Sequence, residues 1–419
     1  MLMKKIKINP ISFQLIDFVP ALSGLIGKTA LVSSFAVVWA SQYHITRSDF
    51  VFENVRLEMI IGSVITLLAA LLLANTAPSG TLAPLIVMVP TMAAFGVHPF
   101  ILGILAGIIG ALGIKTKLFH KLIALSGTVS RTSLTLTIGI SGVLLSFKNL
   151  NTFFADRHTS LLLILILLAF IYLLLRRWNK AWLIVPLAAI VSVIISVVSG
   201  ISIGSVSHIT LPSFNPSYWW NEMWGIGFGL NAVTILKTLP FAFFILILWA
   251  IDTVSITTML DANYKPGEKK EEISLESSIL LTAFRNTVGG FFGGAQTSAL
   301  WRSFLIPLFM VKRPLRPASI LLGILGIIAG FTAIPIKVLS FPPLIWSVLL
   351  FGIFLPFTVV GLTNLRATEK WWKQLAIITV SAAGVFYSLI FTWVGAVLFE
   401  LVLKKWQKSN ATECPDPES

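Results

Sequence analysis

Apolar runs long enough to cross a bilayer recur along the whole chain, and this pattern most restricts what the chain can fold into. About 20 apolar residues span the hydrocarbon core of a membrane as one helix. Only 11% of the 419 residues are charged, whereas a soluble domain carries roughly 25%. Mean hydropathy is +0.90. The sequence therefore predicts an all-α polytopic membrane protein.

The apolar runs divide into fourteen predicted segments. The first seven cover 18–40, 57–74, 82–97, 98–114, 127–147, 160–176 and 181–200. The second seven cover 232–259, 274–290, 296–311, 318–335, 342–363, 371–387 and 388–404. The connection 201–231 contains PSYWWNEMW and predicts an interfacial helix, because Trp and Tyr favour the headgroup zone.

The distribution of basic residues predicts the orientation. With the N-terminus inside, 21 of the 31 lysines and arginines fall in cytoplasmic segments and 5 in outer segments. Cytoplasmic loops carry such an excess. We therefore expect both termini in the cytoplasm and a bacterial inner-membrane location. The net charge of +14 is then explained by cytoplasmic loops, so we expect the lipid bilayer as partner and no nucleic acid.

An internal repeat divides the chain in two. Residues 101–110 read ILGILAGIIG and residues 321–330 read LLGILGIIAG, with six of ten positions identical. Seven segments per half make the halves run through the membrane in opposite senses, which is typical of transporters. We expect repeats at 1–222 and 223–404, followed by a cytoplasmic tail at 405–419.

Each repeat contains a predicted half-helix, in segments 3 and 10, entered through a short extended strand. Leu85–Phe95 follows a Pro-rich stretch that cannot be regular helix. Ser298–Met310 follows four glycines in GGFFGGAQTSALWRSF, and Gln296-Thr297-Ser298 is its predicted helix cap. Helix N-termini at mid-membrane depth attract anions, although two ordinary kinked helices remain an alternative. The expected substrate-binding residues are Thr81, Leu82, Ala83, Gln296, Thr297, Ser298, Ala299 and Arg302.

Charges inside the apolar runs are the other candidate functional residues. Asp252 lies deep in the eighth segment with Ser255 on the same helix face, and membrane-embedded carboxylates are usually functional. We expect this pair to bind a coupling ion, H⁺ or Na⁺. Arg302 either attracts substrate or neutralises Asp252, and Lys28 and Arg285 are further candidate charge partners. Arg285 is otherwise expected to face outer water, and Glu58 to lie near a membrane interface. No metal site, cofactor or enzymatic constellation is expected.

These residues resemble the SulP anion permeases. Asn286–Ser303 is similar to that family's Asn-x-x-x-Gly-x-Phe-Gly-Gly run and the P-x-T-G-[AS]-x-x-R-[ST] pattern after it. Thr297, Ala299, Arg302 and Ser303 match, whereas Ala295 and Ser298 replace the proline and the glycine. Ala250-Ile251-Asp252-Thr253 resembles the family's A-[IL]-E-S, with Asp for Glu.

The resemblance implies a core domain of segments 1–4 and 8–11, a gate domain of segments 5–7 and 12–14, and elevator-like motion. The family's STAS domain is not expected, because the tail after segment 14 is short. The predicted function is secondary transport of a small anion, resembling sulfate, bicarbonate or a carboxylate. The alternatives are nucleobase–cation symport, an anion channel and a non-transporting membrane scaffold. A homodimer through the gate domain is also expected.

Overall fold

The computed structural model describes residues 12–73, 75–153, 158–178, 180–198, 211–263, 272–334, 336–339 and 343–412. The helices of the first half are α1 (Phe18–Gln42), α2 (Phe50–Leu72), η2 (Ala83–Met88), α3 (Val89–Ala94), α4 (Pro99–Lys115), α5 (Leu118–Leu125), α6 (Thr128–Phe153), α7 (His158–Arg177) and α8 (Ile184–Val198). Two short 3₁₀ turns, Leu15–Asp17 and Ala181–Leu183, precede α1 and α8.

The helices of the second half are α9 (Pro216–Tyr218), the π-helical turn η4 (Trp219–Met223), α10 (Ala232–Asn263), α11 (Leu275–Phe291), α12 (Arg302–Met310), α13 (Leu315–Thr332), α14 (Ile336–Leu339), α15 (Pro343–Arg366), α16 (Trp371–Phe386) and α17 (Leu389–Thr412). Six described helices are long and apolar enough to cross a membrane, or seven if the bent pair α4 and α5 is one span. The protein is an all-α membrane protein, and the count of fourteen spans stays a prediction.

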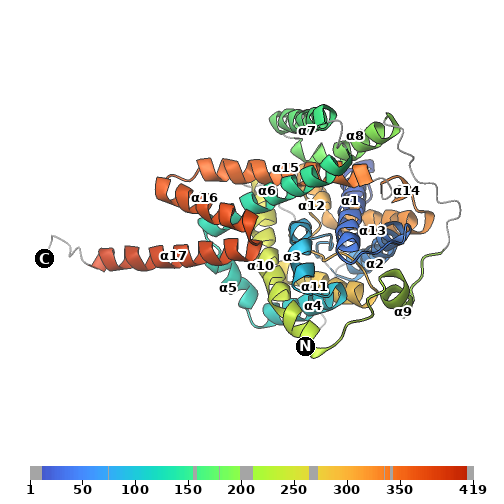
Figure 1. The fold of residues 1–419 in the computed structure, drawn as a ribbon, viewed down its shortest axis with the longest axis horizontal. Coiled ribbons are helices and arrows are strands. Elements are labelled where there is room, and N and C mark those ends of the chain that lie inside the picture. The colour runs from blue at the N-terminus through green and yellow to red at the C-terminus, as the bar shows by residue number, and fades with distance from the viewer. Residues whose placement is uncertain are drawn as a thin grey trace.

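The helices pack into two groups. In one group, α1 contacts α2, α12 and α13, while α4 contacts α10 and α11. In the other, α6 and α15 form the most extensive pair and are joined by α7, α8, α16 and α17. Figure 1 shows α16 and α17 extending together to one side, away from α1, α2 and α13.

Glycines that the sequence repeat aligns lie at helix contacts in both α4 and α13. A Cβ atom at Gly103 of α4 would lie 3.1 Å from the Asn286 oxygen on α11, and one at the aligned Gly323 of α13 would lie 2.8 Å from the Leu67 Cβ on α2. Small residues let helix backbones approach closely inside a membrane. Glycines of both matching stretches therefore allow close helix packing, and the inverted repeat stays a prediction.

Part of the predicted interfacial helix lies in the described residues as α9 and η4, and 199–210 lies outside them. Trp219 and Met223 are buried, and the Trp224 indole N–H donates to the backbone oxygen of Gly293, 2.8 Å away. This connection therefore packs against the glycine-rich break that precedes α12.

Candidate functional site

The two extended stretches that precede the half-helices pair with each other. Ser79 and Leu300 form an isolated antiparallel bridge. The Gly80 N–H donates to the Ala299 oxygen at 2.7 Å and the Leu82 N–H to the Thr297 oxygen at 2.8 Å. We call 78–82 together with 297–301 the crossing. It brings the N-terminal ends of η2 and α12 side by side, from sequence positions more than 200 residues apart.

The second half-helix is shorter than the sequence predicts. α12 begins at Arg302 rather than Ser298, and its N-cap residue is Trp301, whose side chain makes no capping hydrogen bond. The interpretation of Gln296–Ser298 as the helix cap is therefore wrong. The reason is that this backbone is already used in the bridge and in bonds to other helices, so helix formation starts after it.

Helices α10 and α11 hold Ser298 in place. The Asn286 amide oxygen accepts from the Ser298 N–H at 2.8 Å, and its amide nitrogen donates to the Ser298 oxygen at 3.2 Å. The Trp249 indole N–H donates to the same oxygen at 2.8 Å. Buried non-helical backbone needs such partners, because a membrane offers no water to replace them.

Asp252 of α10 and Arg302 of α12 form an ion pair. The Asp252 side chain is 7% exposed and the Arg302 side chain 27%. The Arg302 guanidinium carbon lies 5.5 Å from the ring centre of Phe357, which belongs to α15. Arg302 is therefore located where the two helix groups meet. The side chain of Ser255, the other predicted coupling residue, lies outside the described part.

A buried network joins Glu58 to Thr81 of the crossing through Gln296, which immediately precedes the second stretch of the crossing. The Glu58 carboxylate forms an ion pair with Arg285 and accepts from the Gln296 side-chain amide at 2.8 Å. The Gln296 amide oxygen in turn accepts from the Thr81 hydroxyl. Glu58 and Arg285 are 0% exposed. Hydrogen bonds and the ion pair thereby link Thr81 and Gln296 to Glu58 on α2 and Arg285 on α11.

This network corrects two sequence-based interpretations. The sequence predicts Glu58 near the membrane interface and Arg285 near outer water. In the structure both side chains are buried and form an ion pair with each other. Arg285 therefore pairs with Glu58 and not with Asp252. Asn54 and Glu58 lie one turn apart on α2, and Asn54 binds the break as well, donating to the Gly293 oxygen at 3.0 Å. The spacing of Asn54 and Glu58, one helical turn apart, was the sequence signal from which this buried polar network could have been predicted.

Lys28 of α1 lies beside the crossing, and no acid of the described ranges forms an ion pair with it. Its ammonium nitrogen is 4.5 Å from the ring centre of Trp301, and Gly62 of α2 leaves the space that the ammonium fills. The Trp301 indole donates to the Gly24 oxygen at 3.1 Å, which fixes the ring against α1. Lys28 is not the partner of Asp252.

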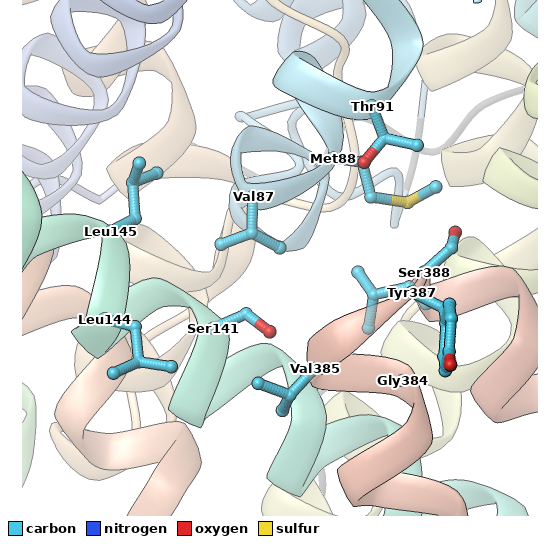
Figure 2. Close-up of a pocket in the computed structure, with 11 residues that line it drawn as sticks. Val87, Met88, Thr91, Ser141, Leu144, Leu145, Gly384, Val385, Tyr387 and Ser388 are labelled. Carbon is cyan, nitrogen blue, oxygen red and sulfur yellow. The ribbon is translucent and has the colours of Figure 1, made fainter. Parts of the chain in front are cut away.

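A cavity of about 190 Å³ lies between the first half-helix and the other helix group. Figure 2 shows Val87, Met88 and Thr91 from η2 and α3 facing α6 and the α16–α17 junction. Thr91, Ser141, Tyr387 and Ser388 carry hydroxyl groups, and the other lining residues are Val, Leu, Met and Gly. No side chain that lines the cavity is charged.

The structure brings most of the predicted substrate residues together. Thr81, Leu82, Thr297 and Ala299 belong to the crossing, Ala83 begins η2, and Gln296 contacts Thr81. Within the described ranges, no three His, Cys, Asp or Glu side chains gather as metal ligands would. The arrangement offers polar backbone, two helix N-termini and one partly exposed guanidinium to a ligand.

Comparisons with known proteins agree with this fold. A family model described as "Protein of unknown function (DUF3360)" matches residues 6–404. The sequence matches no functionally curated protein. The transmembrane domain of the cyanobacterial bicarbonate transporter BicA superposes with a TM-score of 0.60 at 14% identity, covering 92% of this chain and 98% of that domain.

The anion transporter SLC26A9 gives the same structural result. One structure matches with a TM-score of 0.60 at 13% identity, covering 94% of this chain and 66% of that chain. The murine Slc26a9 in an inward-facing state also has a TM-score of 0.60 at 13% identity, with 96% and 70% covered. At these identities the likeness establishes the fold. The chain belongs to the DUF3360 family, and it is an integral membrane protein with the SLC26A9 and BicA transmembrane fold.

Proposed function

We propose that this protein is a secondary transporter of a small anion. One observation carries the proposal. Arg302 is the first residue of α12, it lies beside the crossing, and it forms an ion pair with Asp252. Helix N-termini bind anions through exposed N–H groups and a partial positive charge. The fold likeness to anion transporters BicA and SLC26A9 supports the same conclusion.

The helix contacts support an inverted repeat. If α1 to α8 and α10 to α17 hold segments 1–7 and 8–14, the contact of α2 with α13 has its symmetry mate in the contact of α4 with α11. The contact of α6 with α17 likewise has its mate in that of α15 with α8. A pseudo-twofold relation of this kind places the substrate at the repeat interface. The crossing occupies that interface in our proposal.

Two helix groups suit alternating access. The α1–α4 and α10–α13 group would carry the crossing as the mobile core, and the α6–α8 and α15–α17 group would form the gate and the dimer contact. The cavity between η2 and α6 lies at the boundary of these groups. Elevator-like movement of the core along this boundary would expose the site to each side in turn.

Asp252 would couple transport to an ion. While its carboxylate holds Arg302, the guanidinium is engaged, and a proton or Na⁺ on the carboxylate would release the guanidinium to the anion. Both partners lie in a low-dielectric region where such an exchange has a large effect. The coupling residue and the substrate would therefore compete for one contact, the Arg302 guanidinium.

Counterflow in proteoliposomes tests the proposal. Vesicles loaded with unlabelled candidate anion and diluted into a trace of labelled anion should accumulate label transiently, and saturably, for at least one of chloride, nitrate, formate, bicarbonate and sulfate. Accumulation of uracil or xanthine alone would favour nucleobase–cation symport. Non-saturable flux would favour a channel, and absence of flux for every solute would favour a scaffold.

A further inference from the structure

A sharp corner in the chain joins the two helix groups. α4, which packs against α10 and α11, is followed by α5 at an angle of 90°, and α5 leads into α6 of the other group. α4 has 17 residues and is therefore about 25 Å long, close to the ~30 Å hydrocarbon core of a bilayer. A helix that leaves such a span at a right angle lies in the plane of the membrane. α5 is therefore located in the headgroup zone.

One face of α5 is buried and the other is exposed. Phe119 and Leu122 are each 3% exposed and pack inward, where α5 contacts α4 and α10. Lys117, His120 and Lys121 are exposed and share the opposite face, since they are three or four positions apart. Amphipathic helices with a basic polar face bind anionic lipid at the membrane surface. Because protein already covers the apolar face of α5, its basic face is the one left for a partner.

The lysines of this corner have no counter-charge within the described ranges. Lys115 ends α4, Lys117 precedes α5 and Lys121 lies within it, and all three are exposed. The ion pairs of the described part involve other basic residues. The sequence contains no Asp or Glu between Glu58 and Asp156, so the segment itself supplies no acid to the corner.

One acid from another helix reaches the connection between α5 and α6, and its carboxylate is already occupied. Glu400 of α17 accepts from the N–H groups of Gly127 and Val129 at 3.0 and 2.7 Å. It also accepts from the Ser130 hydroxyl at 2.9 Å. These donors lie at the N-terminal end of α6, where a side-chain oxygen satisfies N–H groups that have no partner within the helix. With that carboxylate engaged by α6, the corner presents uncompensated positive charge to the headgroup zone.

We propose that residues 115–121, the basic corner, bind the headgroup of an anionic phospholipid through its phosphate. Lys117 and Lys121 lie one turn apart, with about 5–6 Å between their Cβ atoms, so both ammonium groups can reach one phosphate. Leu112, three residues before Lys115 on α4, is 54% exposed and offers apolar surface for an acyl chain next to the headgroup. This apolar neighbour favours a lipid over free phosphate. The lipid would be held at the joint between the two helix groups.

Thermal unfolding of the full-length protein in detergent micelles tests this inference without a transport assay. A ligand that binds the folded state raises the unfolding midpoint by mass action. Added phosphatidylglycerol should raise the midpoint more than added phosphatidylcholine. Lys115→Gln/Lys117→Gln/Lys121→Gln should lower the apparent affinity for phosphatidylglycerol about 100-fold, because each basic residue near an anionic membrane surface contributes roughly fivefold.

Two further triple variants serve as controls. Replacing the same three lysines by arginine keeps the charge and should keep the wild-type response. Arg176→Gln/Arg177→Gln/Lys180→Gln removes three exposed basic residues at the connection between α7 and α8, with the same loss of net charge, and should also keep it. If the triple glutamine variant of the basic corner fails to fold, Lys121→Gln alone should lower the apparent affinity about fivefold.

An equal rise with both lipids in the wild type, or an unchanged affinity in the glutamine variants of the basic corner, would overturn the proposal. An equal loss of affinity in the control at the α7–α8 connection would overturn it too, since the lipid would then respond to net charge and not to the corner. Glycerol phosphate, the free headgroup anion, should leave the midpoint unchanged at matched ionic strength, and a rise equal to that with lipid would exclude the lipid as occupant. None of these measurements requires transport, so their failure would leave the proposed function unaffected.

Discussion

The substitution Glu58→Gln tests the buried network most sharply. Glu58 and Arg285 are 0% exposed, so the substitution leaves a guanidinium in the interior without an anion. Removing one partner of a buried ion pair costs about 3–5 kcal/mol. The amide oxygen introduced at position 58 can still accept from the side-chain amide of Gln296, whose nitrogen lies 2.8 Å from the native carboxylate. The expected loss of unfolding free energy is therefore about 3–5 kcal/mol, and it comes from the unpaired Arg285.

Reversible denaturation of the purified protein in mixed micelles measures this loss. The double variant Glu58→Gln/Arg285→Met should recover most of the stability, because no unpaired guanidinium remains. Asp49→Asn, which breaks the exposed ion pair with Arg47, is the control, and it should cost about 1 kcal/mol or less because both side chains stay in water. A loss below about 1 kcal/mol in Glu58→Gln, or a double variant no more stable than the single, would refute the reasoning.

Three further predictions concern the crossing. Gly80→Ala places a Cβ 2.7 Å from the Trp301 Cα, so the stretches must separate, and uptake should fall about 100-fold in proteoliposomes while the protein still reaches the membrane. Asp252→Asn should abolish uptake driven by H⁺ or Na⁺ gradients without loss of membrane-inserted protein, and unchanged coupled uptake would exclude the coupling role. Trp249→Phe removes the bond to the Ser298 oxygen and should lower unfolding free energy by about 1 kcal/mol in the micelle assay.

The sequence predicts the helices well because their signal is local. Apolar runs locate α1 and α13 to within a few residues, whereas α2 begins at Phe50 and not at 57, and the prolines and glycines locate both breaks. The repeat at 101–110 and 321–330 predicts equivalent roles for α4 and α13; the aligned Gly103 and Gly323 both lie at helix contacts, and the inverted repeat stays a prediction. The sequence left several basic partners open for Asp252, and Arg302 was one of them.

The contacts within the site could not be predicted in the same way. Glu58 and Arg285 are 227 positions apart, and each looks like an isolated interface charge in a hydropathy profile. The bridge between Ser79 and Leu300 likewise depends on how the two halves interleave. Because that bridge occupies the backbone before Arg302, the local rule for helix capping placed the start of α12 too early.

Neutralising the Arg302–Asp252 pair tests the central claim most directly. Arg302→Met/Asp252→Asn removes the guanidinium and leaves no unpaired acid, while Arg56→Met/Glu53→Gln removes a second ion pair, one that involves a buried arginine of α2 outside the crossing. Counterflow of the anion that the wild type transports should be lost in the first double variant and retained in the second. Equal counterflow in both variants would contradict an anion site at the crossing.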